Sequence, residues 1–339
     1  MIVQKFIPLR GVMVFAGFHL VWLTLYALAI ALLFQFAGWH WITIPWVPIA
    51  LIGTTVAFYL GFKNSQAYDR MWEARKIWGS IVNSSRSFGV MVNSFIKNDS
   101  LSNQEIIEIK SKLIYRHIAW LYTLREQLLV PTQWEHVSLR KQFGSINVTR
   151  KEKYGVGQFS DYLDKTQEKA YFFDKHEWKD CANQATQIIR IQSEELMQLK
   201  CNDCINVFYQ IELQNELNNF YTFQGQAERI KKFPFPRQFA NSSFLLNGIF
   251  ILLLPLGLVG EFAKLGSFGI WLMIPFAILV SWVFIVMELV GDYSENPFEG
   301  LINDIPMLSI CRTIEIDLLQ MLGSKEVPKP IQPVHDILM

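Results

Sequence analysis

Charged residues are absent from four long apolar stretches of the chain. These windows are 27, 21, 23 and 23 residues long and span residues 11–37, 42–62, 238–260 and 265–287. A helix needs about 20 apolar residues to cross the hydrocarbon core of a bilayer. The pattern therefore predicts four membrane-spanning helices and excludes a soluble globular protein.

The four windows form two pairs. Residues 38–41 separate the first pair, and residues 261–264 separate the second. Connections this short join antiparallel helices, so both pairs return to the side from which they entered. We therefore predict an all-α membrane protein with four transmembrane helices in two hairpins and a polar middle region on one side of the membrane.

Basic residues are concentrated in that middle region. Of the 31 Lys and Arg, 25 lie between Lys63 and Arg237, whereas the two hairpin loops contain only Lys264. The positive-inside bias then places both termini and the middle region in the cytoplasm. A formal net charge of +1 excludes nucleic-acid binding driven by net charge.

The middle region has helical periodicity. Residues 104–129 carry apolar side chains at intervals of three and four, and Pro131 then ends the pattern. Residues 178–199 and 205–230 are similar, and residues 144–157 have loop composition. We expect a helical cytoplasmic domain continuous with the membrane helices.

Candidate chemistry of other kinds is sparse. Cys201 and Cys204 form a lone C-x-x-C pair, without the second Cys or His pair that a zinc site needs. The six His are scattered, and no phosphate-binding loop or nucleophile elbow occurs. We therefore predict no metal, no cofactor and no enzymatic activity.

Two sequence runs flank the middle region. The first comprises Gly61–Gly79 and Asn83–Arg86, and the second comprises Asn296–Glu299, Asn303–Met307 and Ile310–Glu315. Together with the two hairpins, these runs resemble the bestrophin family, and its bacterial members in particular. The resemblance covers residues 1–323.

The resemblance implies a homopentameric ion channel around a central pore, in the bacterial inner membrane. The second membrane helix of a bestrophin lines a narrow neck with three side chains spaced four apart. The Leu60-Gly61-Phe62 match places these at Thr54, Phe58 and Phe62, where Thr54 replaces the usual aliphatic residue. A spacing of four independently puts the three on one helix face.

The chain is accordingly divided into five segments. Residues 1–62 form a first transmembrane hairpin with the pore-lining helix, 63–237 a cytoplasmic helical domain, 238–287 a second transmembrane hairpin, 288–323 a C-terminal cytoplasmic helical segment, and 324–339 a flexible tail. The expected partners are other copies of the chain, the lipid bilayer and permeant monovalent ions, with no nucleic acid.

The sequence leaves the permeant ion open. Animal bestrophins are anion channels, whereas characterised bacterial members can prefer cations. Phe58 stands where animal members also have Phe, which favours chloride. The alternatives are a sodium-selective channel of the same family, or a helical membrane transporter or receptor of another class.

The resemblance also implies two further sites. A cytoplasmic constriction of the pore matches Ile205, whose alternative role is that of a packed helix residue. Animal members bind calcium after the Asn-Pro-Phe tripeptide, but here only Glu299 and Asp304 supply carboxylates, too few for an ion that prefers six to eight oxygens. We expect Asp304 to cap the next helix, with Pro306 in its first turn.

Overall fold

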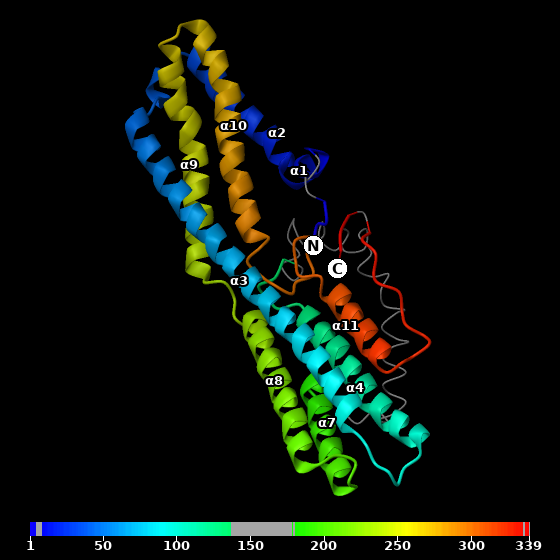
Figure 1. The fold of residues 1–339 in the computed structure, drawn as a ribbon. Coiled ribbons are helices and arrows are strands. Elements are labelled where there is room, and N and C mark those ends of the chain that lie inside the picture. Colours follow the sequence, from blue (N-terminus) through cyan, green and yellow to red (C-terminus); the bar gives the residue numbers. More distant parts are fainter. Residues whose placement is uncertain (5–8, 137–177, 179, 335, 339) are drawn as a thin grey trace. The chain divides into compact units, whose positions relative to one another are not determined.

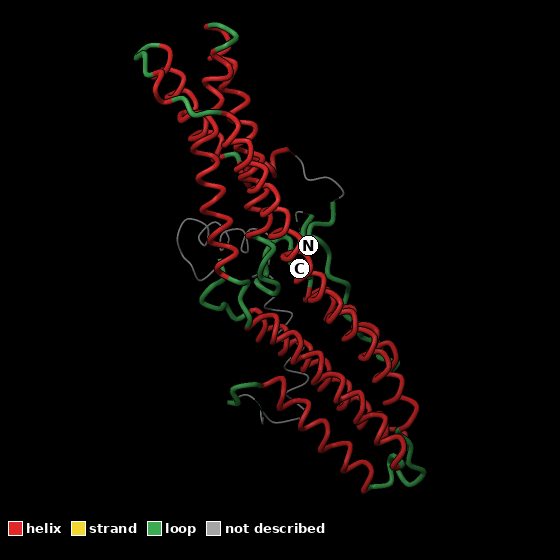
Figure 2. The backbone as a smooth tube through the Cα atoms, turned by 90° about the vertical axis from the view of Figure 1, so that its left-hand side faces the viewer, coloured by secondary structure: helices red, strands yellow, loops and turns green. Residues whose placement is uncertain are grey.

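The structure, a computed structural model, describes residues 1–4, 9–136, 178, 180–334 and 336–338. Within these residues helices and loops make up the chain, and the only strand-like pairings are isolated bridges that Ile337 makes to Ile2 and Val334 (Figure 2). The all-α prediction is confirmed. The chain divides into a membrane unit, residues 4–70 and 234–296, and a polar unit, residues 1–3, 71–233 and 297–339.

Four of the described helices are long and apolar enough to cross a membrane, as the charge-free windows predicted. They are α2 (Phe18–Gln35), α3 (Trp46–Phe95), α9 (Arg237–Ala263) and α10 (Ser267–Asp292). Figure 1 shows α9 and α10 as antiparallel neighbours, and a short 3-10 helix, η1 (His40–Ile42), lies between α2 and α3. α3 is one continuous helix of 50 residues that contributes to both units.

The first window is divided into two helices, which the sequence did not predict. α1 (Leu9–Ala16) ends before Gly17, and α2 begins at Phe18. The indole Nε1 of Trp282 donates to the carbonyl oxygen of Ala16 at 3.1 Å. A side chain of α10 therefore satisfies a carbonyl at the end of α1, so the break leaves that polar group bonded.

Helices α3 and α9 approach closely through two glycines. A Cβ at Gly53 of α3 would lie 2.6 Å from a ring carbon of Phe250 on α9. Conversely, a Cβ at Gly257 of α9 would lie 2.3 Å from Cδ1 of Ile49 on α3. Small residues are common at such crossings because van der Waals contact drives helix association in lipid.

The polar unit packs helices around a second hydrophobic core. Its helices are α4 (Asn103–Leu129), α7 (Gln184–Cys201), α8 (Val207–Lys232), α11 (Met307–Met321) and the second half of α3. Trp78, Trp120 and Trp178 are among its fully buried side chains. The predicted helical domain is thus present.

The helix boundaries follow capping residues. α4 begins at Asn103 because Ser102 and Glu105 form a reciprocal capping box. α7 begins at Gln184, not at the predicted Trp178, because Asn183 accepts a hydrogen bond from the N–H of Thr186 at 3.2 Å. The predicted loop at residues 144–157 lies outside the described residues.

The C-terminal segment after Gly323 is extended. Val327 and Ile331 pack against the core of the polar unit. The N–H of Leu338 donates to the carbonyl of Met1 at 2.9 Å, so this segment pairs with the first residues of the chain. Its predicted flexibility stays a prediction.

His117 is a neutral side chain of the polar-unit core. Its Nε2 lies 2.9 Å from the hydroxyl of Ser85, and its ring stacks on Trp120 and contacts Phe220. Burial penalises the imidazolium ion and lowers the pKa of His117 to about 3. In the unfolded chain the ordinary value near 6.5 applies.

Acidification is expected to destabilise the protein through His117. Because its folded pKa lies below the unfolded one, the unfolded chain gains a proton first as pH falls below about 6.5. Between pH 7 and pH 5 this costs about 2 kcal/mol of stability. Denaturant titrations at both pH values, on the wild type and on His117→Gln, measure the effect; equal pH dependence in the two proteins would contradict it.

Candidate pore-lining face of helix α3

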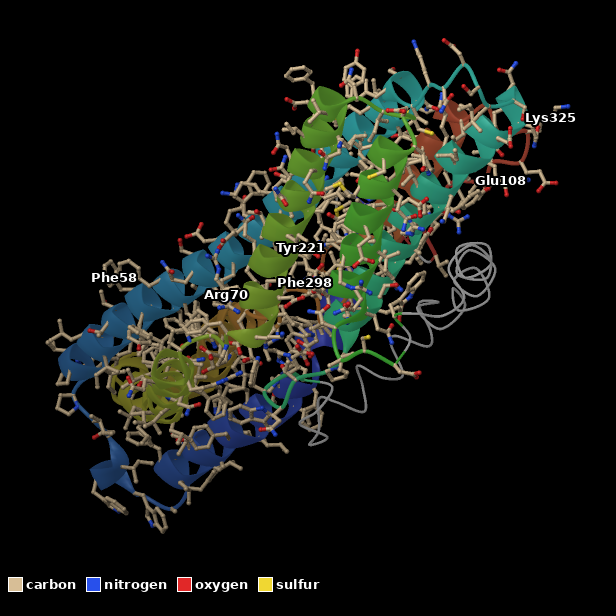
Figure 3. The ribbon with its side chains drawn as sticks, turned by 90° about the horizontal axis from the view of Figure 1, so that it is seen from below. Phe58, Arg70, Glu108, Tyr221, Phe298 and Lys325 are labelled. Atoms are coloured by element: carbon tan, nitrogen blue, oxygen red, sulfur yellow. The ribbon has the colours of Figure 1, made fainter. Side chains whose placement is uncertain are left out.

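One face of α3 exposes apolar side chains within the membrane unit. Phe58 is 69% exposed, Phe62 is 56% exposed, and Thr54 is also exposed. Figure 3 shows Phe58 projecting outward from the helix. The three predicted neck residues therefore share one exposed face, and their role at a pore stays a prediction.

The side chains on this face contact one another and their own helix. The rings of Phe58 and Phe62 meet edge to face, with centroids 4.6 Å apart and planes at 90°. The hydroxyl of Thr54 donates to the carbonyl of Ala50 at 2.9 Å. This bond directs the polar atom of Thr54 back along the helix.

A buried stripe on the opposite side fixes the orientation of α3. Its members are spaced by three and four residues and are all buried: Ile49, Gly53, Val56, Leu60, Lys63 and Ala67. At about 100° per residue, this stripe is centred about 180° from Phe58. The packing of α3 against the rest of the chain therefore determines that Phe58 points away from the packed helices.

One member of the buried stripe is charged. Nζ of Lys63 lies 2.5 Å from Oε1 of Glu288 on α10, and the two side chains are only 2% and 10% exposed. The hydroxyl of Ser243 on α9 donates to the other Glu288 oxygen at 2.6 Å. We call these three residues the Glu288 cluster. It ties α3, α9 and α10 together one residue after Phe62.

The contact between α3 and α10 is extended by two neighbours of this cluster. Nδ2 of Asn64 donates to the carbonyl of Met287 at 3.2 Å. A Cβ at Gly291 would lie 2.3 Å from Oδ1 of Asn64, so any larger residue there would displace the Asn64 side chain from this position.

Two arginines contact Glu295, in the segment that follows α10. Nε of Arg70 on α3 donates to the backbone carbonyl of Glu295 at 2.9 Å. Nη1 of Arg237 on α9 lies 3.1 Å from the carboxylate of the same residue, which is 1% exposed. Charged groups thus join α3 and α9 to the segment that follows α10.

In the loop before α11, Asp304 has a different role from the one predicted. Its carboxylate accepts hydrogen bonds from the N–H groups of Phe298 (3.0 Å), Gly300 (2.6 Å) and Ile305 (2.7 Å). No side-chain cap is present at Pro306, which precedes α11. The expectation that Asp304 caps this helix is therefore wrong: its oxygens hold the preceding loop instead, where Phe298 has a positive φ of 69°.

The neighbouring carboxylates of the polar unit also bond within the protein. Glu299 lies 3.1 Å from Nδ1 of His136. Lys231 of α8 contacts Glu135 at 2.5 Å and donates to the carbonyl of Phe298 at 3.2 Å. Burial raises the pKa of Glu135, which the contact with Lys231 opposes. Glu299 and Asp304 are thus engaged in holding this loop.

Ile205 belongs to the core of the polar unit and is 4% exposed. It precedes Asn206, which caps α8 by accepting a hydrogen bond from the N–H of Tyr209 at 2.9 Å. Exposed apolar side chains nearby include Val207 (47%), Phe208 (74%) and Ile211 (47%). The predicted role of Ile205 as a constriction stays a prediction.

Within the described part of the chain, no three His, Cys, Asp or Glu residues lie together as a group that could bind a metal ion. Cys201 and Cys204 therefore belong to no such group.

The sequence matches a family model described as bacterial and fungal bestrophin protein over residues 9–320. The chain belongs to the bestrophin family. The resemblance drawn from the two flanking runs is thereby confirmed.

Curated relatives and solved structures agree with this assignment. A voltage-dependent anion channel-forming protein, YneE of Escherichia coli O157:H7, is 28% identical over 286 residues, which cover 84% of this chain and 80% of the relative. A protein of the same description from Mesorhizobium japonicum is 26% identical over 85% of this chain and 78% of the relative. The crystal structure of a bacterial bestrophin homologue from Klebsiella pneumoniae has a TM-score of 0.71 at 21% identity, covering 91% of this bestrophin and 99% of that chain.

The Glu288 cluster was missed by sequence reasoning. Lys63 and Glu288 are the first charged residues after the second and fourth apolar windows, and both positions were predicted only as boundaries of membrane-spanning segments. Each of the two lies one residue beyond a continuous apolar run, and this shared position was the signal in the sequence that could have suggested a pair. Periodicity along one helix could not show that the two side chains meet.

Proposed function

We propose that this bestrophin is a pentameric channel that conducts small monovalent ions passively across the bacterial inner membrane, with anions favoured. The observation that carries the proposal is the exposed apolar face of α3 at Phe58 and Phe62, backed by a buried stripe. A single subunit leaves this face uncovered, as a helix that lines a shared pore requires. The names of the curated relatives support an anion as the permeant ion.

The neck acts as the gate. Five copies of Phe58 and Phe62 form apolar rings, and a narrow apolar ring excludes water and so opposes the passage of ions. Ring edges are weakly positive and ring faces negative. Ring edges turned to the pore axis therefore tolerate an anion better than a cation. Thr54 makes one end of the neck more polar.

Charge asymmetry supports the orientation. The hairpin between α9 and α10 contains Lys264, but Glu261 lies 2.7 Å from it and offsets its charge. The polar unit, with most of the basic residues, then lies in the cytoplasm with both termini.

A second constriction, in the cytoplasmic part of the pore, is better assigned to the exposed Phe208 than to the buried Ile205. A side chain that lines a pore must be exposed on its own chain, and Ile205 is packed in the core.

Planar-bilayer recording of the purified protein under a salt gradient tests the proposal. We expect currents whose reversal potential lies nearer the equilibrium potential of chloride than that of sodium. Phe58→Ile is expected to move the reversal potential towards sodium. Absence of current, or a monomer in solution, would refute the channel, and an unchanged reversal potential in Phe58→Ile would remove Phe58 from the neck.

A further inference from the structure

The exposed face of α3 continues beyond the neck to an acidic residue. Asp69 follows Phe58 by eleven residues, which is three helical turns plus about 20°. Ser65 lies between them at a similar angle, and both Ser65 and Asp69 are exposed. Asp69 therefore points in nearly the same direction as Phe58, about 10 Å along the axis from Phe62.

Among the described residues, the carboxylate of Asp69 has no partner, unlike the other acids of α3, α9 and α10. α3 contains two acidic residues, and the other, Glu73, lies 2.7 Å from Arg229. Glu288 and Glu295 of the membrane unit are paired with Lys63 and Arg237. Within the described residues no hydrogen bond or ion pair neutralises Asp69, so its full charge acts on its surroundings.

We propose that Asp69 is a selectivity-determining residue of the channel. This inference rests on the proposed function, since only a pentamer brings five copies of Asp69 into a ring. Rings of Asp or Glu in a pore concentrate cations and repel anions. The ring opposes the preference of the phenyl neck, and the measured selectivity is the balance of the two.

The charge of the ring acts over a limited distance. Lys76 is the next charge at the same register of α3, seven residues or about 10 Å further along the helix. This separation is about one screening length at physiological ionic strength. Asp69 is nearer to the neck, so its charge dominates the field that an ion meets on leaving Phe62.

The test is the reversal potential of Asp69→Asn in planar bilayers. Asparagine keeps the shape of the side chain and removes the charge. A ring potential of about one kT raises the local sodium concentration about threefold and lowers the local chloride concentration about threefold, so we expect its removal to raise the chloride-to-sodium permeability ratio about sevenfold. The shift should be larger at low salt than at high salt. Asp69→Glu should keep the wild-type ratio.

Glu108→Gln on α4 is the matched control, because it removes an exposed carboxylate from a different helix. An unchanged ratio in a pentameric, conducting Asp69→Asn protein overturns the role of Asp69 alone. Wild-type protein that passes no current overturns the proposed function together with this inference. If Asp69→Asn does not assemble, Asp69→Ser replaces it, and an unchanged ratio there has the same meaning.

Discussion

Glu288→Gln is expected to lower the free energy of unfolding by about 3–5 kcal/mol, the usual cost of breaking a buried ion pair by removing one partner. The substitution leaves the ammonium group of Lys63 buried, with its side chain 2% exposed and no opposing charge. It also turns one of the two oxygens that accept hydrogen bonds from Lys63 and Ser243 into an amide NH2 group, which donates. Denaturant titration of the detergent-solubilised protein measures the loss.

Two companion variants identify the cause. Glu261→Gln breaks an exposed pair with Lys264, whose side chains are 42% and 69% exposed, and should cost no more than about 1 kcal/mol. The double variant Lys63→Met and Glu288→Met leaves no buried charge, so it should be more stable than Glu288→Gln. A Glu288→Gln protein as stable as Glu261→Gln would show that the cluster does not hold the three helices.

Removing both phenyl rings of the neck is expected to raise single-channel conductance at least tenfold. The double variant Phe58→Ala and Phe62→Ala widens an apolar ring and lets water enter, which lowers the barrier to ions. A barrier lower by only about 1.4 kcal/mol raises the rate tenfold. Both side chains are exposed in the subunit, so their loss leaves no cavity in its core.

Single-channel recording in symmetric salt measures this effect. Phe268→Ala on α10 is the matched control, because Phe268 is 74% exposed and does not lie on α3. Its conductance should equal that of the wild type. A wild-type conductance in the double Phe58 and Phe62 variant would exclude these rings as the gate.

The sequence predicted the elements whose pattern is local. Charge-free windows located α2, α3, α9 and α10, and the absence of Pro and Gly between Phe62 and Gly79 predicted that α3 continues beyond the membrane. A spacing of four placed Thr54, Phe58 and Phe62 on one face. Each of these inferences depends only on the period of an α-helix.

The features that the sequence did not predict depend on contacts between distant segments. The break at Gly17 is accompanied by the hydrogen bond from Trp282, more than 260 residues away. The bonds of Asp304 depend on a loop conformation with a positive φ at Phe298, which a search for helix caps could not find. The burial of Ile205 depends on the tertiary core around it.

The position of Lys63 directly after Phe62 limits how the neck can move. Successive side chains point about 100° apart, so rotating α3 to turn Phe62 off the exposed face would also pull Lys63 away from Glu288. Such a rotation separates two buried charges within the membrane and leaves each without its partner. In the proposed channel, α3 is therefore held against rotation about its axis, and the neck opens through torsions of the phenyl side chains or through displacement of whole subunits.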